Sequence, residues 1–420
     1  MKKLTIICVL LFITFSACST ATPPSVPIIT AYSTDSPPVT SEAESIALLS
    51  RSRYQLTETG FFIGGTHIAF HDFASTGAMV VCIQPGCTHT DALCMAFIGT
   101  SAEYAFYRDT FYVMQLHDVG LTRRATFKAR AATDNIWTVL WEYDFTPHGS
   151  RNVSTRLGGG YAVIAVNEFI NEFGLEEVED DVYSTNIIAA INLETQTVVD
   201  IIPRRRLINY ESFLLVGADK GKAVIMWTGF ESEVLNHLEY MIKYMEQDGI
   251  SAEEATDNWF ISSEAKRINR IAVLDLETGV EVTLVEGRPS ELFLHSFNVV
   301  HQGILYYVHN QTVYAYSLQD GTTEALFNMP NIGGMSVLDG RIFYTINSMM
   351  VEGHFSFHYY IIETGEHRQL NNEGNREYWV YSLHSENGTK FFGFNPPHGH
   401  FIIPKEDFYN EYFGRVIWID

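Results

Sequence analysis

Residues 297–327 contain four short runs in which apolar and polar residues alternate, and each run is followed by a turn sequence. The runs are Phe297 to Val300, Ile304 to His309, Val313 to Leu318 and Thr323 to Phe327. Alternation with a period of two is typical of β-strands. The turns His-Gln-Gly, Asn-Gln and Gln-Asp-Gly contain residues that tolerate positive φ in tight hairpins. The segment therefore predicts four antiparallel strands in meander order, which is the composition of one β-propeller blade.

The hairpin formed by the last two of these strands recurs along the chain. The sequences VLDLETGVEVTLV, YSLQDGTTEALF and YIIETGEHRQL place Leu276, Leu318 and Ile362 in the same phase, at separations of 42 and 44 residues. Leu193 and Phe73 occupy the same phase in two earlier segments. Separations of this size are typical of propeller blades and predict a repeat architecture.

Counting such units from Arg51 onward predicts seven blades, with six or eight as alternatives. The units are residues 51–85, 100–146, 152–203, 210–287, 292–329, 332–372 and 376–420. We therefore expect residues 51–420 to form an all-β domain, a seven-bladed β-propeller of four-stranded antiparallel blades.

The fourth unit is longer than the others, since 83 residues separate Leu193 from Leu276. Within it, residues 232–259 carry Val234, Leu238 and Met245 at helical spacing. This pattern predicts a helical insertion at about residues 230–265, between strands of the fourth blade. The helix would either cap the edge of the propeller or bind a partner.

The N-terminus has the features of an export signal. Lys2 and Lys3 precede an apolar run from Leu4 to Phe15, which is short for a span of the bilayer. The run ends in Phe15-Ser16-Ala17-Cys18, which resembles the lipobox of bacterial lipoproteins, although Phe15 stands where that family usually has Leu. The resemblance implies that residues 1–17 are a signal peptide and that Cys18 is lipidated. The alternative is an ordinary secretory signal with a chance cysteine.

Residues 18–50 are rich in Ser, Thr and Pro and show no hydrophobic period. Such a segment buries too little apolar surface to offset its ordering entropy, so it predicts a disordered tether. Removal of residues 1–17 takes away two lysines and no acids, which moves the net charge from −23 to −25. So acidic a chain excludes nucleic acid as a partner, and attachment to the membrane would rest on the N-terminal lipid rather than on a basic patch. The expected location is the outer face of the bacterial cell membrane.

Three of the five cysteines cluster in the stretch CIQPGCTHTDALCMAF, which starts at Cys82 and lies in the connection between the first and second predicted blades. Cys82, Cys87, His89 and Cys94 could supply three thiolates and one imidazole to a structural Zn²⁺, a closed set with no open position. Two of the cysteines could instead form a disulfide, or all three could stay reduced in the core. In each case the cluster would stabilise the loop rather than catalyse a reaction.

The pattern C-x-x-P-x-C-x-H-x4-C-x-A-F in this stretch resembles a segment of β-propeller lipoproteins from Firmicutes, which carry it after an early blade. The likeness covers the N-terminal signal, the tether, this motif and the repeat pattern. It implies the propeller fold and the extracytoplasmic location, and it implies no established activity.

The sequence contains no G-x-S-x-G, H-E-x-x-H or phosphate-loop motif, and no catalytic residue is assigned. The pattern favours a membrane-anchored module that binds or scaffolds a protein or carbohydrate ligand. The alternative is an extracytoplasmic enzyme, such as a carbohydrate-active one, with its site in the propeller channel. A third interpretation is the sensory part of a larger envelope assembly, with the inserted helix as its docking element.

Overall fold

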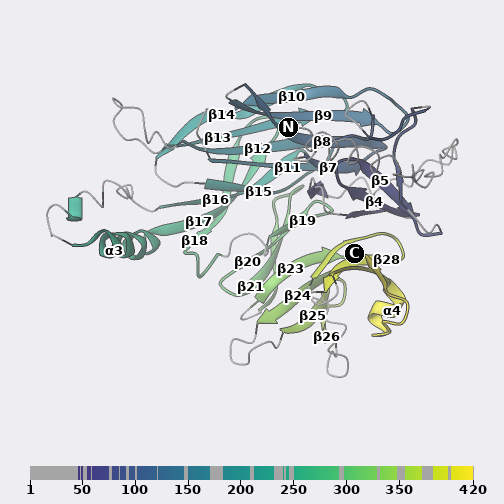
Figure 1. Ribbon diagram of the computed structural model, residues 1–420. Coiled ribbons are helices and arrows are strands. Elements are labelled where there is room, and N and C mark those ends of the chain that lie inside the picture. The colour runs from purple at the N-terminus through teal and green to yellow at the C-terminus, as the bar shows by residue number, and fades with distance from the viewer. Residues whose placement is uncertain are drawn as a thin grey trace, which may run out of the picture. The chain divides into compact units, whose positions relative to one another are not determined.

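The described part of the computed structural model contains seven antiparallel sheets, each with four consecutive strands in meander order; two of the sheets have a fifth strand from the N-terminal segment (Figure 1). The structure describes residues 46–47, 49–50, 54–57, 59–74, 78–84, 86–90, 94–99, 102–120, 122–145, 150–170, 183–208, 212–230, 240, 243–245, 250–292, 298–328, 332–347, 355–370, 382–395 and 399–419. Within these residues the chain is a seven-bladed β-propeller, as the repeat pattern predicts.

Each blade contains four strands that follow one another in the sequence. The first blade contains β3 (Tyr54–Leu56), β4 (Gly60–Gly64), β5 (Ile68–Asp72) and β6 (Ala78–Val80), and the second contains β7 (Ala102–Tyr107), β8 (Thr110–Val119), β9 (Thr122–Ala131) and β10 (Thr138–Asp144). The third blade contains β11 (Ser150–Gly158), β12 (Tyr161–Ile170), β13 (Tyr183–Asn192) and β14 (Val198–Ile208), the fourth β15 (Ser212–Asp219), β16 (Lys222–Phe230), β17 (Arg267–Asp275) and β18 (Glu281–Gly287), and the fifth β19 (Val299–His301), β20 (Ile304–His309), β21 (Thr312–Ser317) and β22 (Thr323–Asn328). The sixth blade contains β23 (Ile332–Leu338), β24 (Arg341–Asn347), β25 (Phe355–Ile361) and β26 (Glu366–Gln369), and the seventh contains β27 (Ser382–Glu386), β28 (Lys390–Asn395), β29 (Gly399–Pro404) and β30 (Ile417–Ile419).

In most blades the turn between the first and second strands has an uncommon backbone conformation. In the second to sixth blades, two residues join the first strand to the second, and both have positive φ. The turns are Arg108–Asp109, Gly159–Gly160, Lys220–Gly221, Gln302–Gly303 and Asp339–Gly340. Two positive φ values are the requirement of the type I′ hairpin, whose twist matches that of the strands. A larger residue would also clash at position 159, since a Cβ there would lie 2.5 Å from the backbone nitrogen of Lys220.

The recurring hairpin of the sequence joins the third strand of a blade to the fourth. Its conformation comes from a polar residue at the end of the third strand. Oδ1 of Asp275 accepts hydrogen bonds from the backbone N–H groups of Glu277 and Thr278, at 3.2 and 2.8 Å. In the third blade, Oδ1 of Asn192 accepts in the same way from the two residues that follow Leu193. These Asx turns explain why the hairpin has a similar sequence in several blades.

Buried apolar side chains fill the interfaces between consecutive blades. Between the third and fourth blades, for example, Val163 and Ile188 pack with Leu215 and Ile225 in one cluster. Comparable clusters lie at the other interfaces of the described chain, including the one between the seventh blade and the first. Since each blade is buried on both faces, its central strands have apolar residues on both faces as well.

The ring closes between the seventh and first blades without a shared strand, because β3–β6 and β27–β30 come from opposite ends of the chain. The closing cluster contains Leu56, Phe61, Phe392 and Ile402. The rings of Tyr54 and Phe392 lie 5.6 Å apart, centroid to centroid, across this interface. Nδ2 of Asn387 donates to the carbonyl oxygen of Thr57 at 2.5 Å. Side-chain packing and this hydrogen bond therefore hold the two ends of the described chain together.

Two short strands precede the first blade. β1 (Ile46–Ala47) pairs with β11, and β2 (Leu49–Ser50) pairs with β7. They add a strand to the inner edges of the third and second blades. The sequence places residues 18–50 in a tether, whereas β-pairing in the structure already begins at Ile46.

The fourth blade carries the helical insertion that the sequence predicts. α3 (Ala252–Glu264) lies between β16 and β17, and Oγ of Ser251 caps it by accepting from the N–H of Glu254 at 3.1 Å. Ala255, Trp259 and Ser263 form its buried stripe, at intervals of four residues. Tyr240 and residues 243–245 are helical too, whereas Val234 and Leu238 lie outside the described residues.

Polar side chains also join consecutive blades. Nε2 of Gln55 donates to the carbonyl oxygen of Phe106 at 2.6 Å, and the N–H of Phe106 donates to Oε1 of Gln55 at 2.7 Å. Asn167 binds both backbone groups of Phe213 in the same manner, at 2.8 and 3.3 Å. Gln55 and Asn167 are buried, so each amide satisfies two backbone groups that water does not reach.

We predict that Gln55→Met lowers the free energy of unfolding by about 1–3 kcal/mol, because it leaves the N–H and C=O of Phe106 buried without partners. Urea denaturation measures the change. Gln369 on β26 is exposed, so Gln369→Met is the matched control and should change stability by less than about 0.5 kcal/mol. Equal stability of the two variants would contradict the bridging role of Gln55.

Candidate metal centre

The cysteine motif lies in the connection between β6 and β7, and backbone hydrogen bonds fix both ends of that connection to the first blade. The N–H of Val81 donates to the carbonyl oxygen of Ile68, and the N–H of Ile68 donates to that of Ala96, both at 2.9 Å. Further along, the N–H of Ile98 donates to the carbonyl oxygen of Thr66 at 2.9 Å. The start and the end of the connection are thereby held beside the same turn of the blade.

Inside the connection the backbone turns back on itself. Gly86 and His89 have φ values of 72° and 57°, in the left-handed region that is uncommon for a side chain such as histidine. The N–H of Cys87 donates to the carbonyl oxygen of Gln84 at 3.3 Å. This local turn places Cys87 and His89 opposite Cys94.

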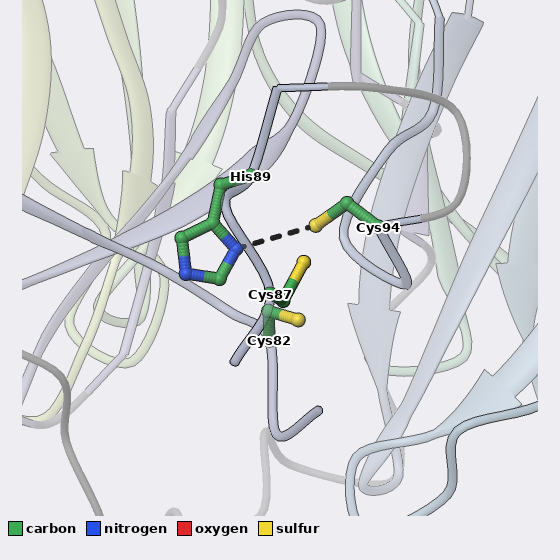
Figure 2. A group of neighbouring side chains, drawn as sticks. All are labelled: Cys82, Cys87, His89 and Cys94. Atoms are coloured by element: carbon green, nitrogen blue, oxygen red, sulfur yellow. Dashed lines mark hydrogen bonds between the residues drawn. The ribbon is translucent and has the colours of Figure 1, made fainter. Parts of the chain in front are cut away.

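The four residues singled out by their spacing come together in the structure. One ligand atom of each of Cys82, Cys87, His89 and Cys94 lies within 4.8 Å of the others. Figure 2 shows the three Sγ atoms and the imidazole pointing toward one another, with Nδ1 of His89 3.4 Å from Sγ of Cys94. The fold therefore brings a Cys3His group together.

The cluster lies at the edge of the core rather than in solvent. Cys94 is 2% exposed, and the other three residues are partly exposed. The pKa of the Cys94 thiol is raised to about 12, chiefly by burial; the backbone of Ala96 opposes the rise, and hydrogen bonding to Cys87 and Cys82 adds to it. All three cysteines are free thiols in the structure. Binding of a metal cation would therefore have to release the proton of Cys94.

The donor set fits a zinc ion in type and in size. Thiolate and imidazole are the ligands of structural Cys3His sites, with Zn–S distances of about 2.3 Å. A tetrahedron of that size separates its sulfur atoms by roughly 3.8 Å, so a cluster within 4.8 Å needs only a small contraction. Four protein ligands complete the tetrahedron, which leaves no position for a substrate or a catalytic water.

Met95 links the cluster to its surroundings. Its Sδ accepts a hydrogen bond from the N–H of Ile83 at 2.9 Å, and its carbonyl oxygen accepts from Nε1 of Trp137 at 3.0 Å. The ammonium of Lys128 and the guanidinium of Arg130 lie 5.0 and 5.2 Å from the Trp137 ring. Trp137 belongs to the second blade, so the connection between β6 and β7 contacts the second blade as well as the first. The sequence did not indicate these contacts, because Met95 occupies an unspecified position of the cysteine motif and Trp137 lies outside it.

The other predicted site residue, Cys18, lies outside the residues that the structure describes. Among the described helices, none is both long and apolar enough to cross a bilayer.

No family model and no curated protein matches this sequence. Solved structures similar to the chain include an acylaminoacyl peptidase from Pyrococcus horikoshii, with 10% sequence identity over 89% of this chain and 53% of that one and a TM-score of 0.48. Dipeptidyl peptidase 4 from Porphyromonas gingivalis is 9% identical over 88% of this chain and 59% of that one, with a TM-score of 0.37. The propeller domain of the Trilobed protease from Pyrococcus furiosus is 9% identical over 74% of this chain and 95% of that one, with a TM-score of 0.30. The chain thus spans about half the length of the acylaminoacyl peptidase, and no activity is transferred from any of these proteins.

We predict that, after metal has been removed with a chelator, the thiols of Cys82, Cys87 and Cys94 react with a maleimide at different rates. Cys94 should react at least about tenfold more slowly than Cys82 and Cys87, because the thiolate is the reactive form and burial keeps Cys94 protonated. Peptide mapping by mass spectrometry after timed labelling measures the three rates. Equal rates for Cys94 and Cys87 would contradict the burial of Cys94.

Proposed function

We propose that this protein is a lipid-anchored, extracytoplasmic β-propeller that binds a protein or carbohydrate ligand, and that Zn²⁺ at the Cys3His group is a structural part of it. The observation that carries the proposal is the convergence of four ligand atoms within 4.8 Å in the connection between the first two blades. A closed ligand set favours stabilisation over catalysis.

The proposed role of zinc is to hold the connection between β6 and β7. Cys82, Cys87, His89 and Cys94 would bind the ion, which supplies cross-links between the start, the middle and the end of that connection. Binding would stabilise the folded state, since the ligands are not preassembled in an unfolded chain. Because the connection also contacts the second blade through Trp137, the ion would stabilise the interface of two blades.

Support for the anchor and the location comes from the sequence. The run that ends in Ser16-Ala17-Cys18 resembles a lipobox, and the cysteine motif resembles that of propeller lipoproteins from Firmicutes. A binding role agrees with the propeller fold, because the packed blades hold the connections between their strands in place at the surface. A preformed surface of this kind loses little conformational entropy when a ligand binds.

We predict that the purified protein contains one zinc per chain and that chelation lowers its thermal midpoint. At a free zinc concentration of 100 to 1,000 times Kd, the ion would add about 2.7 to 4.1 kcal/mol to stability. Cys87→Ser should lose the zinc and should be insensitive to chelation. Elemental analysis and thermal unfolding measure the two effects.

Thr88→Ala is the matched control, because Thr88 lies in the same loop, is exposed and has its hydroxyl 2.9 Å from that of Thr90 rather than among the four ligand atoms. It should keep both the zinc and the sensitivity to chelation. A metal-free protein whose intact mass is lower by two hydrogen atoms, as a disulfide requires, would contradict the zinc proposal.

We also predict that the protein expressed in a Gram-positive host incorporates labelled palmitate and partitions into the detergent phase of Triton X-114. Cys18→Ala removes the acceptor thiol, so this variant should incorporate no label and should stay in the aqueous phase. Ser19→Ala, at the next position, should behave like the unaltered protein. Labelling of the Cys18→Ala variant would place the lipid elsewhere and would contradict this anchor.

A further inference from the structure

The two edges of the propeller ring differ in the length of the connections that they carry. The first strand of each blade ends at the edge that we call the short-turn edge. It carries the two-residue turns Arg108–Asp109, Gly159–Gly160, Lys220–Gly221, Gln302–Gly303 and Asp339–Gly340. The turns between third and fourth strands lie at the same edge, as does α4 (Lys405–Tyr409) of the seventh blade.

The opposite edge, which we call the long-connection edge, is where each blade joins the next and where second strands turn into third strands. It carries the connections 81–101, 171–182, 231–266, 288–298 and 370–381. The Cys3His group and α3 belong to two of these connections.

The strands β1 and β2 fix the edge at which the folded chain begins. Ser50 pairs with Glu103, next to the first residue of β7, so the end of β2 lies toward the long-connection edge. Ile46 pairs with Leu157, one residue before the end of β11, so the start of β1 lies at the short-turn edge. The segment therefore runs along the inner edges of two blades, in the direction opposite to their first strands. The chain before Ile46 joins it at the short-turn edge.

A half-buried arginine lies beside the position where β1 pairs. Arg156, the register partner of Ala47, donates from Nε to the carbonyl oxygen of Val216 at 3.1 Å and from Nη1 to that of Thr155 at 3.2 Å. Burial lowers the pKa of this guanidinium, against the charge of Glu103. Arg156 thus ties β11 to β15 of the next blade beside β1, so the segment pairs with backbone that is itself held in place.

We propose that β1 and β2 orient the anchored protein: the short-turn edge faces the membrane, and the long-connection edge, with the Cys3His group and α3, faces away from it. This inference rests on the lipid anchor of the proposed function. Without β1 and β2 the chain would leave from Tyr54, the first residue of β3, at the long-connection edge.

Two exposed glutamines at the ends of one strand test the orientation. Gln302 lies in the turn before β20, at the short-turn edge, and Gln311 lies in the turn after it, at the long-connection edge; their φ values are 49° and 63°. β20 has six residues, so the two positions are separated by roughly 20 Å. Each would carry a donor dye through Gln302→p-azidophenylalanine or Gln311→p-azidophenylalanine, which spares the cysteines.

The lipidated variants are reconstituted into phosphatidylcholine vesicles that contain a rhodamine-labelled lipid, and energy transfer to that lipid is measured on vesicles isolated by flotation. Transfer from position 302 should exceed transfer from position 311 by about twofold or more, given the separation of the two positions. Equal transfer, or stronger transfer from position 311, would overturn the orientation while the anchor stands. Failure of both variants to float with vesicles would overturn the anchor itself, and the orientation with it.

A second pair of variants tests the role of β1 and β2. The double variant Ala47→Pro, Leu49→Pro removes two backbone donors and should release the segment, so the order of transfer from positions 302 and 311 should reverse. Ala43→Pro, which precedes β1, should keep the original order. An unchanged order in the double variant would show that β1 and β2 do not set the orientation.

Discussion

The fold depends on the packing of each blade face against its neighbour, and this packing has to close a ring. Between most blades the chain itself continues across the interface, so the two faces are held close before they pack. Between the seventh and first blades no strand is shared, and Leu56 and Phe61 meet Phe392 and Ile402 only because the ring has closed. The hydrogen bond from Asn387 to Thr57 adds a directional contact at the same place.

The Cys3His group and the N-terminal strands add contacts among the first three blades. The connection that carries Cys82, Cys87, His89 and Cys94 leaves the first blade and contacts Trp137 of the second. β1 and β2 join the second blade to the third through their inner edges. The N-terminal part of the ring is thus reinforced twice, and the interface of the seventh and first blades has neither device among the described residues.

The periodic part of the structure was predictable from the sequence because local patterns determine it. Alternating apolar residues and positive-φ turns gave the four strands around Tyr306 and Tyr314 nearly residue by residue, and the repeat gave seven blades. The insertion in the fourth blade followed from the excess length between Leu193 and Leu276. The spacing of the three cysteines and His89 predicted the four residues whose side chains converge in Figure 2.

The remainder could not be predicted, because it depends on contacts between residues far apart in the chain. Nothing in the segment around Ile46 marks it as a strand; it pairs because the inner edges of β7 and β11 offer unpaired backbone. The network in which Lys405 and Tyr409 bind the carboxylate of Asp339 has the same origin, since these residues are distant in sequence and meet through the packing of two blades.

Closure of the ring is tested most directly by a double-mutant cycle across the interface of the seventh and first blades. Tyr54→Leu and Phe392→Leu remove the two rings whose centroids lie 5.6 Å apart, although the residues are at opposite ends of the chain. A closed ring predicts a coupling free energy of about 0.5–1.5 kcal/mol between them in urea denaturation, with additive effects, within about 0.5 kcal/mol, for Tyr54→Leu and Phe343→Leu in the sixth blade. Additive effects of Tyr54→Leu and Phe392→Leu would contradict the closed ring.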